Sequence, residues 1–124
     1  MNLIVLELPF PPSLNTYWRH ARGRTYINKT GLEYRKIVME YVMRHHLKAA
    51  AGPLEYHVDL YPPDRRRRDG DNFSFKVIWD SLTHSGCIDD DSLFRKWGGQ
   101  WRQPVKGGLA RIYISSYQEI ETHE

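Results

Sequence analysis

A dense set of charges between Asp64 and Asp91 constrains this chain more than any other feature. Seven of the fifteen acidic residues lie in these 28 positions, and the run from Arg65 to Arg68 stands among them. Clustered carboxylates repel one another, so a fold can hold them close together only beside positive charge. Either the arginines or a divalent cation can supply that charge. The stretch is consistent with acids that hold a metal and arginines that hold the anion on which the metal acts.

Length and composition predict one globular domain over residues 1–124. The chain is 40% hydrophobic and 27% charged, which is typical of soluble proteins. No apolar run is long enough to span a membrane, and the N-terminus lacks the basic region of a signal peptide. Cys87 is the only cysteine and has no internal disulfide partner. We therefore expect a cytoplasmic protein without membrane association.

Basic residues gather in three zones, although the net charge is only +3. A basic surface with a local acidic pocket favours a nucleic-acid enzyme over a passive binder, whose acids would repel phosphate. Ordinary solvated surface charge is the alternative. The zones comprise Arg19, Arg22, Arg24, Lys29, Arg35 and Lys36; Arg65, Arg66, Arg67 and Arg68; and Arg95, Lys96, Arg102, Lys106 and Arg111.

Hydrophobic periodicity predicts an α+β fold, with a mixed sheet of about four strands and two main helices. A capping box of Thr30 and Glu33 predicts where the first helix begins, and Gly52 marks its end. Asp71 or Asn72 caps the second helix, which ends at Gly86. The expected strands are 2–8, 54–60, 94–101 and 110–117, the last two joined by a turn near 106–108.

Residues 9–29 show no clear period. They alternate aromatic and basic side chains, among them Tyr17, Trp18, Arg19 and Arg22. Rings stack on bases and arginines meet phosphates, so this pattern is typical of a nucleic-acid surface. A long loop pinned by aromatic packing explains it equally well.

The acids suit a hard metal ion. Alternate side chains of an extended segment share a face, so Asp69 and Asp71 can meet one ion, and they precede a helix N-terminus that favours anions. Asp89, Asp90 and Asp91 follow the same helix, so a shared site requires the later loop to fold back. Magnesium takes oxygen ligands of this kind and supports phosphodiester hydrolysis. One cysteine and scattered histidines give no zinc-ligand spacing.

The motifs together resemble the RusA family of Holliday-junction resolvases. The resemblance begins with Leu8-Pro9-Phe10-Pro11-Pro12-Ser13-Leu14-Asn15 and continues through Tyr17, Arg19, Arg22, Gly23 and Arg24. It is carried further by Asp64-Arg65-Arg66-Arg67-Arg68-Asp69-Gly70-Asp71-Asn72, by Asp80, Leu82 and Gly86, by the pair Asp90-Asp91, and by Lys106-Gly107-Gly108. It covers nearly the whole chain, in order and at similar spacing.

This resemblance implies a small, magnesium-dependent, homodimeric endonuclease that binds four-way DNA junctions and cuts two opposed strands symmetrically. Asp69, Asp71 and Asp91 match the catalytic, metal-binding carboxylates, and Asp90 is a neighbouring candidate ligand. Lys76 resembles the catalytic lysine that stabilises phosphate charge in the transition state. An exposed helix lysine paired with Asp80 is the alternative.

Two positions depart from the family pattern. Lys76 follows Asp71 by five residues, where the family usually has four, and we expect the extra residue in the first helical turn. One residue on a helix rotates a side chain by about 100°. Leu93 stands where the family usually has a polar residue.

The resemblance and the charges also predict the DNA contacts and the assembly. Alternation along an extended run predicts that only two of the four arginines face DNA, with affinity that falls steeply with salt. The expected contacts are Arg65, Arg66, Arg67, Arg68, Arg19, Arg22, Arg24 and Lys106. Paired nicks on a two-fold junction favour an intertwined or two-fold homodimer.

Two other functions remain open. The same surface can belong to a non-catalytic module that recognises nucleic-acid structure, with the acids as caps and solvated charge. A nuclease of this fold can also act on other branched or single-stranded DNA.

Overall fold

The computed structural model describes residues 3–13, 18–21, 23–66 and 75–118. These residues form an α+β fold with a mixed four-stranded sheet and two helices, as the sequence predicts. The elements, in chain order, are β1 (Ile4–Leu8), β2 (Trp18–Ala21), β3 (Arg24–Ile27), α2 (Lys29–Arg44), β4 (Leu54–Tyr61), α3 (Lys76–Ser85), the 3₁₀ turn η2 (Asp91–Leu93), β5 (Phe94–Trp101) and β6 (Leu109–Ser116).

The sheet has the strand order β1-β6-β4-β5. β6 pairs antiparallel with β1 and β4, whereas β4 and β5 are parallel. Parallel neighbours need a crossover, and α3 provides it between β4 and β5. β5 and β6 follow each other in the chain, but β4 lies between them. The predicted turn near 106–108 therefore carries the chain past the end of β4 rather than closing a hairpin.

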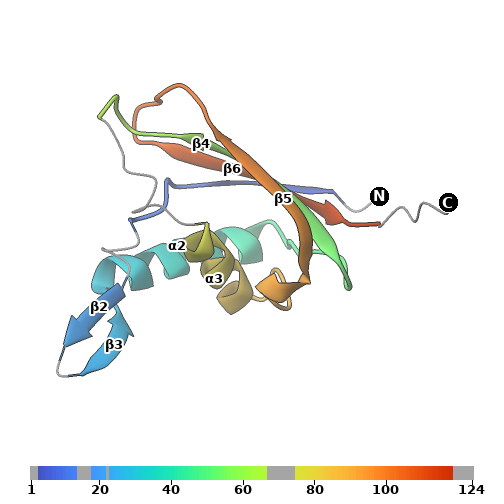
Figure 1. Ribbon diagram of the computed structural model, residues 1–124, viewed down its shortest axis with the longest axis horizontal. Coiled ribbons are helices and arrows are strands. Elements are labelled where there is room, and N and C mark those ends of the chain that lie inside the picture. Colours follow the sequence, from blue (N-terminus) through green and yellow to red (C-terminus); the bar gives the residue numbers. More distant parts are fainter. Residues whose placement is uncertain (1–2, 14–17, 22, 67–74, 119–124) are drawn as a thin grey trace, which may run out of the picture.

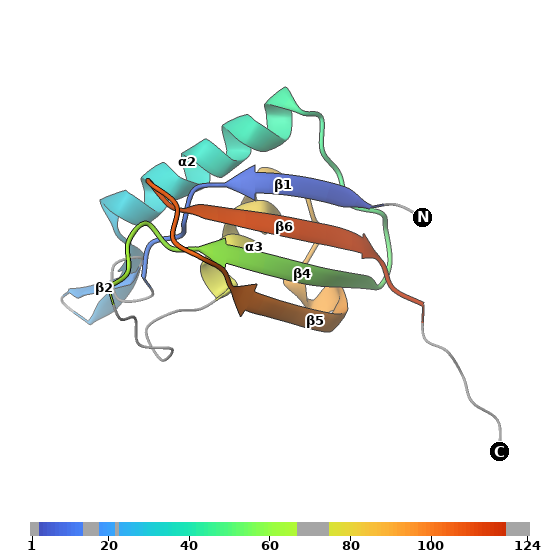
Figure 2. The ribbon, with the colours of Figure 1, turned by 90° about the horizontal axis from the view of Figure 1, so that it is seen from above.

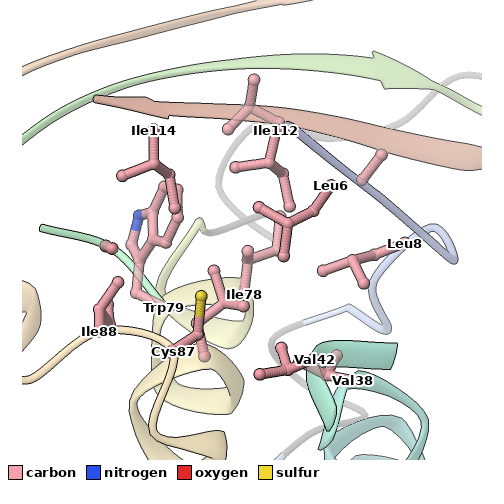
Figure 3. Packing of buried hydrophobic residues seen from close by; sticks show 14 of the residues in the cluster. Leu6, Leu8, Val38, Val42, Ile78, Trp79, Cys87, Ile88, Ile112 and Ile114 are labelled. Atoms are coloured by element: carbon pink, nitrogen blue, oxygen red, sulfur yellow. The ribbon is translucent and has the colours of Figure 1, made fainter. Parts of the chain in front are cut away.

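Both described helices cover the same face of the sheet, and no helix of the described residues lies on the opposite face (Figures 1 and 2). Strand alternation explains the core, because every second residue points toward the helices. Ile112 and Ile114 of β6 meet Ile78 and Trp79 of α3 in this layer (Figure 3). The buried apolar strand residues are Leu6, Leu8, Leu54, Val58, Leu60, Phe94, Ala110, Ile112 and Ile114.

α3 begins at Lys76 and ends where the sequence predicts. Gly86 follows it with φ 83°, a left-handed conformation that glycine adopts without strain. The Gly86 and Cys87 backbone N–H groups donate to the Thr83 and Leu82 carbonyls, each at 3.1 Å. This closure turns the chain sharply toward η2.

α2 differs at both ends from the prediction. It begins at Lys29 with Asn28 as N-cap, so Thr30 and Glu33 lie inside the helix and the predicted capping box is wrong. It ends at Arg44, well before Gly52, because the chain must leave the helix early enough to enter β4 at Leu54. Tyr34, Val38 and Val42 follow the helical spacing of a core face and are buried, whereas Ile37 is 45% exposed.

A second, two-stranded sheet replaces part of the expected irregular segment 9–29. β2 and β3 pair antiparallel, with Trp18 opposite Ile27 and Arg19 opposite Tyr26. This hairpin lies at the start of α2, away from the main sheet (Figure 1). Among the residues that the structure describes, no helix is both long and apolar enough to cross a membrane.

Candidate nucleic-acid site

Three segments that are distant in the sequence meet at one end of the sheet. The Arg102 backbone N–H donates to the Leu60 carbonyl at 2.7 Å, and the Val105 N–H donates to the Pro62 carbonyl at 2.9 Å. A Cβ on Gly108 would lie 2.8 Å from the Phe10 Cβ, so residues 105–108 also approach the segment after β1. Residues 9–13, 62–66 and 102–108 are called the basic end of the sheet below.

The basic end presents exposed cations. Arg65, Arg66 and Lys106 are exposed, and the Arg102 side chain is 45% exposed. Asp64 accepts a hydrogen bond from the Arg66 backbone N–H at 2.9 Å, which folds the start of the arginine run into a turn. The predicted contacts Arg65, Arg66 and Lys106 therefore lie at the same end of the sheet, while Arg67 and Arg68 fall outside the described residues.

Lys76 lies toward the same end. The ring of Phe75 packs on Gly99, where a Cβ would lie 2.6 Å from the Phe75 Cζ. α3 therefore starts over the C-terminal half of β5, which ends at the basic end (Figure 2). Lys76 is the first helical residue and is exposed. The N-terminus of a helix carries partial positive charge, which repels a cation such as Lys76. The position of Lys76 becomes favourable when an anion binds beside both the lysine and the helix N-terminus.

Most of the Asp71 to Lys76 spacing lies outside the described residues. The described helix begins at Lys76, and Phe75 before it already has helical backbone angles, with φ -61° and ψ -17°. The extra residue expected in the first helical turn and the cap expected at Asp71 or Asn72 both concern residues 71–74, so they stay predictions.

Asp80 holds the two helices together. Its Oδ2 accepts a hydrogen bond from the Arg35 guanidinium at 2.7 Å, with both side chains largely covered. Arg35 belongs to α2, so this ion pair fixes α3 against α2. Within the first basic zone, Arg35 thus contributes to packing.

The three consecutive acids Asp89, Asp90 and Asp91 occupy three different environments. Asp89 pairs with Lys48 at 2.6 Å, and both side chains are more than half exposed. Asp90 caps η2, with its Oδ1 3.2 Å from the Ser92 backbone nitrogen. Chiefly because that N–H donates to it, the pKa of Asp90 is lowered from its ordinary value. Asp91 is exposed in the first position of η2.

The described residues do not bring Asp91 and Lys76 together. η2 directly precedes β5, whereas the start of α3 lies over Gly99 near the other end of that strand. From Phe94 to Gly99 the strand extends about 16 Å. No group of three or more potential metal-ligating side chains forms within the described parts of the chain. Asp69 and Asp71 fall outside those parts.

The hairpin carries the remaining predicted contacts. Arg24 is exposed on β3, near Tyr26, which is 49% exposed. Arg19 lies on β2, in register with Tyr26, and Arg22 is outside the described residues. The exposed arginine and tyrosine of β3 match the predicted interleaving of rings and cations.

A buried carboxylate on the uncovered sheet face was not predicted. Asp59 is 4% exposed, and its Oδ1 lies 2.8 Å from His57 Nε2, 3.0 Å from Gln100 Nε2 and 3.2 Å from Arg102 Nε. Burial opposes ionisation, but these contacts outweigh it and lower the pKa of Asp59. The cluster ties Arg102 to the sheet. One feature of the sequence could have indicated this cluster. Asp59 is an acid at an outward-facing position of a largely apolar strand.

Comparison with known proteins agrees with the motifs. Residues 9–115 match the family described as endodeoxyribonuclease RusA. The chain is 42% identical to a crossover junction endodeoxyribonuclease RusA of Shigella sonnei, 41% to one of Escherichia coli K12 and 42% to one of Enterobacteria phage 82. Each match spans 116 residues, or 93% of this chain and 96% of the relative. The chain therefore belongs to the RusA family of endodeoxyribonucleases.

Proposed function

We propose that residues 1–124 form one nuclease domain that resolves four-way DNA junctions by paired, symmetric nicks in a magnesium-dependent reaction. The observation that carries the proposal is the basic end of the sheet. Three motif segments that are far apart in the sequence meet there, next to the start of α3 and Lys76. The biological setting is DNA recombination and repair or phage DNA processing, in the cytoplasm where that DNA lies.

Phosphate binding is the role of the exposed cations. Arg65, Arg66 and Lys106 are exposed at the basic end, and Arg24 is exposed on the hairpin. We assign Arg67, Arg68, Arg19 and Arg22 to the same role from the sequence. Cations that replace the counterions of DNA make binding strongly dependent on salt.

Asp69, Asp71 and Asp91 would hold the magnesium ion. Their carboxylate oxygens are the hard ligands that this ion takes. Asp90 is the weaker candidate, because its Oδ1 already caps η2. When bound, the ion would lower the pKa of water and stabilise the leaving oxygen. Lys76, beside the N-terminus of α3, would bind the phosphate and stabilise its charge in the transition state.

A homodimer would place two sites on one junction. A four-way junction has approximate two-fold symmetry, so two opposed strands present equivalent phosphodiesters to a two-fold pair of subunits. Each subunit would cut one strand. Paired nicks would then follow from the symmetry of the complex.

Cleavage of a synthetic four-way junction tests the proposal. We expect paired nicks at symmetric positions with Mg²⁺, none in EDTA, and no cleavage of a linear duplex made from the same arms. Tight junction binding without cleavage under all metal conditions would favour the non-catalytic binding module. Cleavage of forks or flaps but not of four-way junctions would assign the nuclease to other branched DNA.

Salt dependence tests the role of the arginine run. Replacing both Arg65 and Arg66 with Ala is expected to reduce the slope of log affinity against log salt by about 2, or about one unit per lost phosphate contact. Binding of a junction in EDTA at several salt concentrations measures the slope. Arg44→Ala is the matched control, since Arg44 is exposed at the end of α2 that lies away from the basic end. An unchanged slope in the double variant would remove the arginines from the DNA contacts.

A further inference from the structure

Two large aromatic side chains are exposed on the edge strand β5. Trp97 is 66% exposed and Trp101 is 48% exposed, although burial of an indole is strongly favourable. β5 is the last strand of the sheet, and within the described ranges no further strand pairs with this edge. Exposed aromatic side chains on a protein that binds a partner commonly mark the contact.

The two tryptophans share one face of the strand. Trp97, Gly99 and Trp101 are in register with Tyr56, Val58 and Leu60 of β4. Positions four residues apart on a strand lie about 13 Å apart. Between the tryptophans, the Phe75 ring fills the space over Gly99, and beyond them the Phe10 ring lies 6.2 Å from that of Trp101. Trp97, Phe75 and Trp101 form a row that is called the tryptophan strip below.

The strip continues into the candidate site. Phe75 directly precedes Lys76, and Trp101 directly precedes Arg102 of the basic end. Lys96 and Arg102 alternate with the tryptophans along β5, with side chains that are 71% and 45% exposed. A nucleic-acid strand along this edge would meet rings on one side and cations on the other. Such a combination of stacking surfaces and cations is typical of proteins that bind unpaired nucleotides.

We propose that the tryptophan strip binds, by stacking, nucleobases that are unpaired at the branch point of the DNA substrate. The inference rests on the proposed function and adds a base-binding surface to it. In an intact duplex, base faces are covered by their neighbours and only base edges are accessible in the grooves. A base at a branch opens at lower cost, so an indole can cover its face there. The strip would thus favour branched over linear DNA.

Charge favours DNA over a second copy of this chain as the occupant of the edge. Arg95 and Lys96 are exposed at the start of β5, and lysine on an edge strand discourages pairing with another strand. A second copy of the chain, paired at this edge, would place its own Arg95 and Lys96 against the same cations and be repelled. The phosphates of DNA are negatively charged and would be attracted to them.

Two tryptophan variants test the strip. Trp97→Ala is expected to weaken binding of a labelled single-stranded 12-mer, and of a four-way junction, by about 5- to 100-fold in EDTA. Binding of a linear duplex should stay within about twofold, because its base faces are covered. Trp97→Phe keeps a ring, so it should stay within about threefold of wild type for every DNA. It should nevertheless lose part of the tryptophan fluorescence quenching that single-stranded DNA produces.

Met43→Ala provides the matched control. Met43 is also 66% exposed, but it lies on α2 and should leave binding of all three DNAs unchanged. An equal loss of duplex and junction affinity in Trp97→Ala would overturn the proposal, as would a change in oligomeric state by analytical ultracentrifugation with unchanged DNA binding. Quenching by single-stranded DNA without junction cleavage by the wild type would reject the proposed function alone and retain the strip as a base-binding surface.

Discussion

Asp91→Asn is expected to reduce the rate of junction cleavage by about 10³-fold, because a metal ligand accounts for several kcal/mol of transition-state stabilisation. The amide that replaces the carboxylate has a similar shape but no charge, and it binds a hard cation weakly. Asp91 is exposed, so its replacement should leave the fold intact. Single-turnover cleavage of a labelled four-way junction in Mg²⁺ measures the rate, and binding in EDTA should stay within about twofold of wild type.

Asp89→Asn is the control from the same acid triplet. It removes one negative charge two residues away, and the lost ion pair with Lys48 is a surface pair worth at most about 1 kcal/mol of stability. Cleavage by this variant should therefore be near that of wild type. If the two variants cleave equally fast, Asp91 is not a metal ligand. If both lose activity, the charge of the whole triplet matters rather than one carboxylate.

Ile78→Ala should produce the largest loss of stability, about 3 to 4 kcal/mol in the free energy of unfolding. Ile78 is 0% exposed in the layer between the sheet and the helices (Figure 3). Its removal leaves a cavity that close-packed neighbours cannot fill without strain. Since small domains are stable by about 5 to 15 kcal/mol, this loss is a large fraction of the total.

Urea unfolding followed by circular dichroism measures the effect. The midpoint should fall markedly while the slope of the transition is unchanged, which indicates lost stability without a change in the denatured state. Met43→Ala should shift the free energy of unfolding by about 0.5 kcal/mol or less, because Met43 is 66% exposed on the same helical layer. A small loss in Ile78→Ala would mean that the packing between α3 and the sheet is looser than described.

Elements with a strong local pattern were predicted correctly. β6 alternates buried and half-buried residues, and α3 ends before Gly86 because glycine enters the left-handed turn without strain. The capping box at Thr30 failed because a hydrogen-bonding residue near a helix start can lie inside the first turn as well as before it. The β2–β3 hairpin was missed because its four-residue strands are too short to show a period.

The candidate site was predictable in chemistry and not in arrangement. The sequence indicated arginines for phosphate and acids for a metal, and these assignments remain proposals. It could not separate Asp89, Asp90 and Asp91, which pair with a lysine, cap η2 and begin η2 respectively. Each acid takes its partner from a distant segment or from the local backbone geometry. Three adjacent identical residues carry no sequence signal that tells these environments apart.

The sequence by itself determined the family, the types of element and the chemical groups available, because these depend on residues close together along the chain. Only the tertiary structure decided that β4 lies between β5 and β6, that three motif segments share one end of the sheet, and that Trp97 is exposed on an edge strand. The physical reason is that strand neighbours and edges are set by long-range packing of the core. A tryptophan with the same local pattern would be covered in a central strand and is open to solvent on β5.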